Sequence, residues 1–285
     1  MIAAIASFFG MIIRLIYNLV NSNYFLSIIL FTILTKIILF PLTLIQMKSM
    51  EKMNSIGPED QRIREKYKND KNKQAEELTK LYSENKINPM GGCLPLLIQI
   101  PIIIAMFYIV KQPLTYIKQM PQEELNNYAS TYAHEKLGRE EGQTLTEKEI
   151  RAYELQIAKE YNLLNMKVTD NFDLGEIPKD VFNKNEDQRS SPIALLIPIL
   201  TIIVSFASTK LQQNTQTMSE EQIEMSKTNN LMMPLLSGFI AYTMPLALGV
   251  YWLLGNIISI IQQLVMKKII KGKEEKKALN EGGKI

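Results

Sequence analysis

Lys36 is a positively charged residue in the middle of an apolar stretch. Residues 24–47 contain no other Lys or Arg and no Asp or Glu, and a bilayer crossing needs about 20 residues. A lysine at the centre of a membrane-spanning helix costs about 2.5–3.5 kcal/mol, while each Leu or Ile returns only about 0.3–0.6 kcal/mol. Because about five or six apolar neighbours are needed to offset that cost, we expect Lys36 to face a polar environment and not lipid.

Several other kinds of site are excluded by the residues that the chain has. It contains one histidine and one cysteine, so a Ser-His-Asp site in the membrane, a His-rich metal cluster and an intramolecular disulfide are excluded. The sequence has no Walker-type or GxGxxG loop, and its net charge of +3 is small. The apolar stretches lack carboxylates, which disfavours a proton-coupled transporter and a cation filter. We therefore expect no catalytic residue, no metal, no cofactor and no enzymatic activity.

Polar side chains recur at helical spacing in the other apolar stretches. The faces are Thr32, Thr35, Lys36, Thr43 and Gln46 in the first stretch, Gln99 alone in the second, Thr201, Ser205, Ser208 and Gln212 in the third, and Gly249, Trp252, Asn256, Ser259 and Gln263 in the last. Such side chains commonly bridge neighbouring membrane helices, at about 0.6 kcal/mol each. Several stripes together with a charge favour a shared wet cavity that attracts acidic or polar peptide groups.

Residues 24–47, 94–110, 192–208 and 231–266 contain no Asp or Glu, and Lys36 is their only Lys or Arg. The last stretch is long enough for two spans, with a turn predicted at Met244 and Pro245. We therefore predict an all-α integral membrane protein with five transmembrane helices. The predicted segments are an amphipathic helix (1–22), spans at 23–47, 91–110 and 192–209, a pair of spans at 231–266, loops at 48–90, 111–191 and 210–230, and a basic tail (267–285).

The orientation of these spans is predicted from basic residues. The 48–90 loop carries ten Lys and Arg, and the tail after Met266 carries seven lysines. With five spans both regions lie on one side, which the positive-inside rule makes cytoplasmic, so the N-terminus is expected outside. The chain start lacks the order of a typical secretory signal. A narrow polar stripe of Ser7, Arg14, Asn18 and Asn21 favours a helix lying in the membrane interface, and a sixth span is the alternative.

The two long loops are both predicted to contain helices. The 48–90 loop is expected to form a cytoplasmic helical hairpin with helices at 59–68 and 73–86, and it is either a solvated connector or a docking arm. The candidate contacts of this arm with substrate or ribosome are Arg62, Arg64, Lys66 and Tyr67. In the 111–191 loop, one helix is expected from Pro121. A capping box at Thr146 and Glu149 predicts another helix, ending at about residue 164.

Five segments of the sequence together resemble a known family. They read NYFLSIILFTILTKIILFPLT (23–43), KYKND (66–70), INPMGGCLPLLIQIPIIIAMF (87–107), NFDLG (171–175) and MMPLLSGFIAYTMPLALGVYWLLGNIISIIQQ (232–263). In this order they resemble the YidC family of membrane protein insertases, which has mitochondrial and chloroplast relatives, and they cover about half the chain. The resemblance is to a Gram-positive-like bacterial member, expected to be without the large periplasmic domain of Gram-negative ones.

The resemblance implies that the protein acts through a groove between its helices. The family has a five-helix core around a hydrophilic groove, open to cytoplasm and lipid. This groove takes up polar parts of nascent membrane proteins and releases their hydrophobic segments to lipid, as a chaperone, alone or with the Sec translocon. The charged residue of the groove is usually arginine, and Lys36 occupies that position. The lysine keeps the positive charge but cannot bind a carboxylate through two parallel hydrogen bonds, as a guanidinium can. The expected groove residues are Lys36, Thr32, Thr35, Gln99, Ser205, Trp252 and Asn256.

The resemblance also implies the setting in which the protein acts. The expected location is the bacterial cell membrane. The expected partners are nascent membrane proteins and the lipid bilayer, with the Sec translocon, the signal recognition machinery and the ribosome as candidates and no small-molecule cofactor. A small-molecule or ion transporter using the same cavity is the alternative, although the sequence shows no inverted repeat that would favour it. A structural assembly factor is a third possibility.

Overall fold

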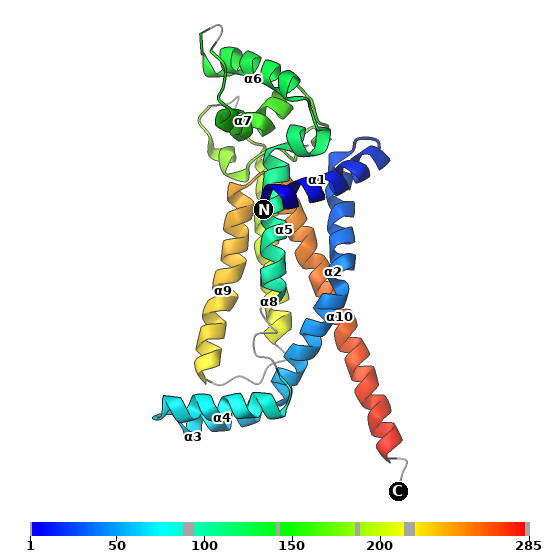
Figure 1. Ribbon diagram of the computed structural model, residues 1–285, viewed down its shortest axis with the longest axis vertical. Helices are drawn as coiled ribbons and strands as arrows, with labels where there is room; N and C mark the ends of the chain where they lie inside the picture. The colour runs from blue at the N-terminus through cyan, green and yellow to red at the C-terminus, as the bar shows by residue number, and fades with distance from the viewer. Residues whose placement is uncertain (1, 88–93, 141–142, 186–188, 214–219, 283–285) are drawn as a thin grey trace. The chain divides into compact units, whose positions relative to one another are not determined.

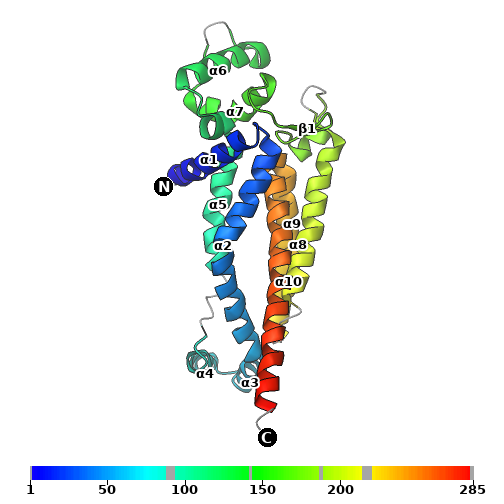
Figure 2. The same ribbon diagram turned by 90° about the vertical axis from the view of Figure 1, so that its right-hand side faces the viewer.

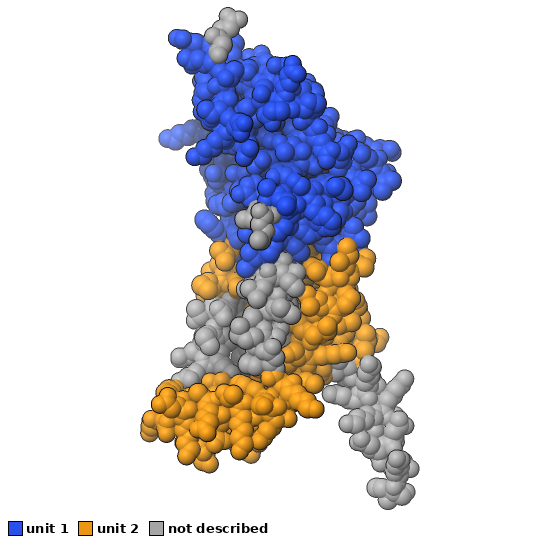
Figure 3. Space-filling view, viewed as in Figure 1, with its two compact units in different colours: residues 1–35, 98–201, 237–254 blue, residues 36–97, 202–236, 255–285 orange. Residues whose placement is uncertain are grey.

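The computed structural model describes residues 2–87, 94–140, 143–185, 189–213 and 220–282, mostly as helices (Figure 1). The chain divides into two compact units, coloured blue and orange in Figure 3. Unit 1 comprises Met1–Thr35, Ile98–Thr201 and Ser237–Leu254, and unit 2 comprises Lys36–Leu97, Ile202–Leu236 and Gly255–Ile285. The helices with residues in both units are α2 (Tyr24–Ser55), α5 (Leu94–Lys111), α8 (Leu196–Gln213), α9 (Glu220–Thr243) and α10 (Leu246–Gly282).

Three helices in the described residues are long and apolar enough to cross a membrane: Tyr24–Met53, Pro192–Leu211 and Leu246–Ile269. Shorter apolar helices cover Ala3–Leu19, Gln99–Lys111 and Leu231–Thr243. On α2, Ile37 and Ile38 are more than 60% exposed, as side chains facing lipid would be. The chain is therefore a mostly helical, multi-pass membrane protein, as expected, whereas the count of five spans stays a prediction.

The break between the last two apolar segments is confirmed. Helix α9 ends at Thr243 and α10 begins at Leu246, so Met244 and Pro245 separate the two helices. The cause is local, because proline lacks the N–H that a continuing helix would need.

The N-terminal helix α1 (Ile2–Leu19) belongs to unit 1 and lies against η2 (Leu114–Lys118), a π-helical turn after α5. Gly10 allows this close approach, since a Cβ at this position would lie 3.0 Å from the backbone oxygen of Tyr116. Arg14 also donates a hydrogen bond to the Gln119 side chain. Helix α1 buries the side chains of Ala6, Ile13 and Tyr17. Its exposed large apolar side chains are Phe8, Met11, Leu15 and Leu19. Helix α1 thus presents one apolar face to the protein and another outward.

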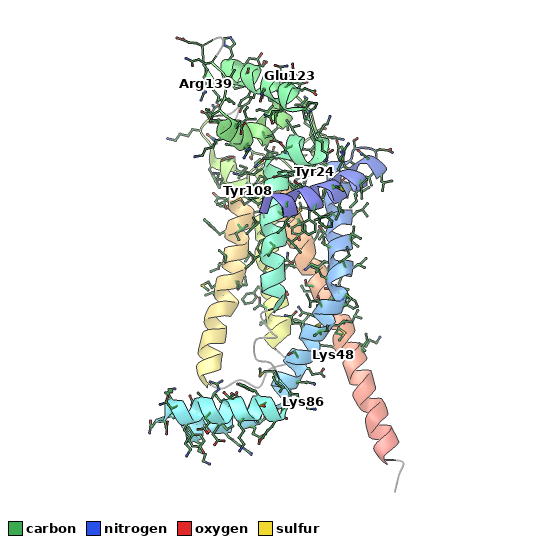
Figure 4. All side chains as sticks on the ribbon, viewed as in Figure 1. Tyr24, Lys48, Lys86, Tyr108, Glu123 and Arg139 are labelled. Atoms are coloured by element: carbon green, nitrogen blue, oxygen red, sulfur yellow. The ribbon has the colours of Figure 1, made fainter. Side chains whose placement is uncertain are left out.

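Helices α6 (Gln122–Leu137) and α7 (Glu147–Glu160) lie side by side in unit 1 (Figure 2). The predicted capping box is confirmed, because Thr146 and Glu149 bond each other reciprocally at the start of α7. Hydrogen bonds from Thr146, and then from Arg139, lower the pKa of Glu149 to about 2. Figure 4 labels Arg139 in the link between these helices. Helix α7 ends four residues before the predicted position, where Asn162 adopts a φ of 49°.

The NFDLG segment at 171–175 supports the start of α10 within unit 1. Its first residues form a two-stranded antiparallel sheet, in which β2 (Phe172–Asp173) pairs with β1 (Lys167–Thr169). The carbonyl groups of Leu174 and Glu176 then accept hydrogen bonds from the N–H groups of Ala247 (2.9 Å) and Leu246 (2.8 Å). The first N–H groups of a helix have no partner within it, so Leu174 of this segment and the following Glu176 satisfy two of those of α10. The small sheet is the main departure from the predicted all-α fold.

Glu154 on α7 is a buried carboxylate that binds the start of η2. It is 0% exposed, and its two oxygens accept hydrogen bonds from the Thr115 backbone N–H (2.6 Å) and hydroxyl (2.8 Å). Burial raises the pKa of Glu154 to about 7, although these hydrogen bonds and the nearby Arg151 oppose that shift. Glu154 therefore links α7 to the segment against which α1 packs.

In unit 2, α3 (Gly57–Lys66) and α4 (Lys71–Glu84) form a helical hairpin, shown in cyan in Figure 1. Both predicted helices are confirmed, although each begins and ends two residues earlier than predicted. The shift has local causes: a proline is favoured in the first turn of a helix, as in α3, and Asp70 caps α4 by accepting from the Lys73 N–H at 3.0 Å. The apolar side chains that join the hairpin are Ile56, Leu81 and Ile87, with Met53, Ile63 and Tyr82 packed against them.

Replacing Gly10 with leucine should loosen α1. Overpacking of a tight contact costs about 1–3 kcal/mol, so we expect Gly10→Leu to lower the melting temperature of the detergent-solubilised protein. The matched control is Ala4→Leu, since Ala4 is exposed on the same helix. Equal melting temperatures for the two variants would contradict the close packing of α1 on η2.

Glu154 should make the stability of unit 1 depend on pH. Its pKa is raised from an ordinary value of 4.5 to about 7, so the folded state holds a proton that the unfolded state releases between these values. Stability should therefore fall as pH rises from about 4.5 to about 7, by up to about 3 kcal/mol. Glu154→Gln, whose side-chain oxygen can accept from the Thr115 N–H and whose amide can donate to the Thr115 hydroxyl, should remove this dependence and slow hydrogen exchange in α7 at pH 8.

The control for this experiment is Glu147→Gln, because Glu147 is exposed at the start of the same helix. Hydrogen exchange of the two variants and the wild type should be compared at each pH, which cancels the intrinsic effect of pH on exchange. If Glu154→Gln retained the slope of the wild type, another group would be responsible for it.

Candidate functional site

Lys36 lies on α2 in unit 2, and its polar contacts come from α10. Its ammonium donates a hydrogen bond to the hydroxyl of Ser259 at 2.9 Å. The side-chain amide of Gln262 donates to the backbone oxygen of Lys36 at 3.2 Å. Gly255, one turn before Ser259, leaves room for the lysine stem, since a Cβ there would lie 3.4 Å from the Lys36 Cε. Polar groups on one facing helix thus reduce the free-energy cost of placing this charge in an apolar helix.

A second polar contact in unit 2 joins α8 to α10. The Asn256 amide donates to the hydroxyl of Ser205 at 3.0 Å, and Ser205 is buried. Further along α10, Lys267 donates to the backbone oxygen of Leu211 at 3.0 Å, where a helix end leaves its carbonyl groups unpaired. The predicted residues Lys36, Asn256 and Ser205 are therefore brought onto one connected set of helices.

The other predicted groove residues, Thr32, Thr35, Gln99 and Trp252, belong to unit 1. The hydroxyl groups of Thr32 and Thr35 are buried and donate to carbonyl oxygens of their own helix at 2.6 Å and 2.9 Å. Such bonds within a helix satisfy the hydroxyl group without a ligand. Gln99 donates to the Tyr251 hydroxyl at 3.3 Å, and Trp252 is partly exposed.

The predicted cytoplasmic contacts differ from one another in their surroundings. Arg62 and Lys66 are exposed, and the Lys66 ammonium lies 5.1 Å from the centre of the Tyr67 ring. Arg64 instead forms an ion pair with Asp60, with 2.6 Å between its Nε and a carboxylate oxygen. Tyr82 of α4 donates to the same carboxylate. Arg64 therefore joins α3 to α4 and is less free to bind a partner.

Sequence reasoning missed part of the Lys36 site. It placed Ser259 and Gln263 on one stripe but did not identify Gln262, and elsewhere it missed Tyr251, which bonds Gln99, and Lys267, which bonds Leu211. At about 100° per residue, Gly255, Ser259 and Gln262 lie within about 60° of each other on α10, and this spacing could have identified Gln262. Among the described residues, no group of three or more His, Cys, Asp and Glu could hold a metal ion.

The chain has recognisable relatives among known proteins. The family model described as 60Kd inner membrane protein matches residues 15–275. A Membrane protein insertase YidC of Fusobacterium nucleatum is 31% identical over 247 residues, which is 86% of this chain and 87% of the relative. A Membrane protein insertase YidC 2 of Listeria innocua is 27% identical over 266 residues, which is 92% of this chain and 70% of the relative. This chain belongs to the 60Kd inner membrane protein family, also called the YidC family.

The difference between Arg62 and Arg64 can be tested directly. Arg64→Ala leaves the buried Asp60 carboxylate without its charged partner, which should destabilise the hairpin by about 1–3 kcal/mol. Arg62→Ala removes an exposed side chain and should change stability by no more than about 0.5 kcal/mol. Hydrogen exchange in α3 and α4 measures both effects. Equal protection in the two variants would contradict the structural role of Arg64.

Proposed function

We propose that this chain is a membrane protein insertase and chaperone, which receives polar parts of nascent membrane proteins beside Lys36 and releases their hydrophobic segments to lipid. Membership of the family supports this function, since its relatives are named Membrane protein insertase YidC. In this proposal five helices cross the membrane, and the polar side chains around Lys36 line a hydrophilic groove.

The observation that carries the proposal is that, among the described residues, Lys36 is bonded to a polar group and to no opposite charge. Its ammonium is bonded to a neutral hydroxyl, and the apolar segments of the sequence contain no Asp or Glu. A cation held in this way can attract a carboxylate from outside the chain, because a charge pair gains more in a low-dielectric site than in water. The ligand class that fits is an acidic or polar peptide segment.

The proposed mechanism needs no covalent chemistry. A wet groove shortens the apolar barrier that a polar terminus or loop must cross. Lys36 attracts the acidic residues of that segment while its adjoining hydrophobic helix enters the bilayer. Burial of apolar surface then drives insertion, at about 25 cal/mol per Å². Nucleotide, metal and cofactor have no step in this scheme.

The remaining parts of the proposal concern topology and partners. The positive-inside rule supports an outside N-terminus and a cytoplasmic C-terminus. The outward apolar face of α1, with Leu19 82% exposed, supports a location in the membrane interface. The exposed Arg62 and Lys66, together with Tyr67, support a contact with nascent chain or ribosome. The Sec translocon and the signal recognition machinery stay predictions, and no finding favours the transporter alternative.

Replacing Lys36 tests the role of its charge. In proteoliposomes, Lys36→Ala should reduce insertion of a Sec-independent substrate with an acidic translocated segment by about tenfold or more, because the attraction is lost. Lys36→Arg should keep insertion at the wild-type level or above, since arginine keeps the charge and its guanidinium can donate two parallel hydrogen bonds to a carboxylate.

Folding of the Lys36 variants must be checked by thermal melting, because Lys36 also contacts α10. A folded Lys36→Ala protein that inserts the acidic substrate as well as the wild type would remove Lys36 from the mechanism. Liposomes that showed specific solute flux and no insertion would favour the transporter.

A further inference from the structure

We propose that Ser259 is a specificity-determining residue, which holds the Lys36 ammonium in place without neutralising it. This inference rests on the proposed function, because it concerns how Lys36 keeps its charge available to acidic segments of a substrate. The neutral hydroxyl at position 259 matters as much as the lysine, since a carboxylate there would form an ion pair within the protein.

The hydrogen bonds of Ser259 show that its hydroxyl oxygen accepts from Lys36. Its hydroxyl donates to the carbonyl of Gly255 at 2.8 Å, so its proton is already engaged. The oxygen is then left to accept from the Lys36 ammonium at 2.9 Å. A lysine ammonium has three donors, and this contact uses one of them. Ser259 thus supports the ammonium while leaving its full positive charge without an opposite charge.

Two neighbours of Ser259 on α10 complete the support. Gly255 lacks a side chain where a Cβ would lie 3.4 Å from Cε and 3.9 Å from Nζ of Lys36, so the lysine end lies over this residue. Gln262 holds the backbone of α2 through its bond to the Lys36 carbonyl. Gln262 therefore acts as a positioning residue for the lysine backbone.

The electrostatic consequence follows from the type of side chain at 259. A hydroxyl offers a dipole and a carboxylate offers a full opposite charge, and the difference is large where water is scarce. An aspartate at 259 would compete permanently with the acidic groups of a substrate. An asparagine has almost the same size and shape as aspartate and still presents a neutral oxygen to the ammonium. The pair Ser259→Asp and Ser259→Asn therefore separates charge from packing.

The experiment uses the full chain in proteoliposomes and two substrates that differ only in the translocated segment. One segment carries Asp and Glu, and the other carries Asn and Gln at the same positions. The quantity measured is the ratio of insertion efficiencies, acidic over neutral. We expect Ser259→Asp to lower this ratio by about tenfold, because insertion of the acidic substrate falls more than insertion of the neutral one. Ser259→Asn should keep the ratio within about twofold of the wild type.

Each result has a defined meaning. A ratio that Ser259→Asp leaves unchanged overturns this inference, and so does an equal loss of both substrates, which would assign Ser259 to folding alone. A fall in the ratio for Ser259→Asn as large as for Ser259→Asp also overturns it, because size and not charge would then be the cause. Failure of the proposed function is separate: the wild type itself would then insert neither substrate.

Discussion

The contact between the Lys36 ammonium and the Ser259 hydroxyl is the interaction on which the organisation of unit 2 depends. An apolar helix can carry a charge only where a polar group meets it, and here that group stands on α10. The same helix also holds α8, through the bond of Asn256 to Ser205. On α10 the α2-facing and α8-facing residues lie about 90° apart around the helix axis. Helix α10 is therefore the common support for both neighbours, and its polar residues are distributed between two adjoining faces.

Unit 1 depends on a different constraint, the pairing of backbone groups where helices begin and end. The carbonyl groups of Leu174, in the NFDLG segment, and of the neighbouring Glu176 satisfy the first two N–H groups of α10. The carboxylate of Glu154 binds Thr115 at the start of η2, and α1 packs on the same turn through Gly10. Unpaired polar groups are costly away from water, so these contacts explain why the connecting segments of unit 1 are ordered around the helix ends.

The local elements were predicted well where a short-range signal exists. The capping box at Thr146 and the break at Pro245 depend on neighbouring residues, and both were confirmed. The contacts of Lys36 were predicted less well, because the polar stripe was drawn through Asn256 and Ser259 to Gln263. That stripe combined residues that face α2 with residues that face α8, and it left out Gln262, which binds α2. Arg64 was grouped with the exposed basic residues because its sequence does not reveal its pairing with Asp60.

The sequence by itself determined that this is a helical membrane protein with a cation in an apolar segment, and its motifs identified the family. The helical membrane class and the cation in an apolar segment follow from composition, periodicity and the cost of charge in a membrane, whereas the family follows from the resemblance of its motifs alone. Only the tertiary structure decided which side chains meet Lys36, that NFDLG supports α10, and that Glu154 is buried. Those properties depend on pairs such as Lys36 and Ser259, more than two hundred residues apart, and no local rule of spacing predicts which distant residues a fold brings together.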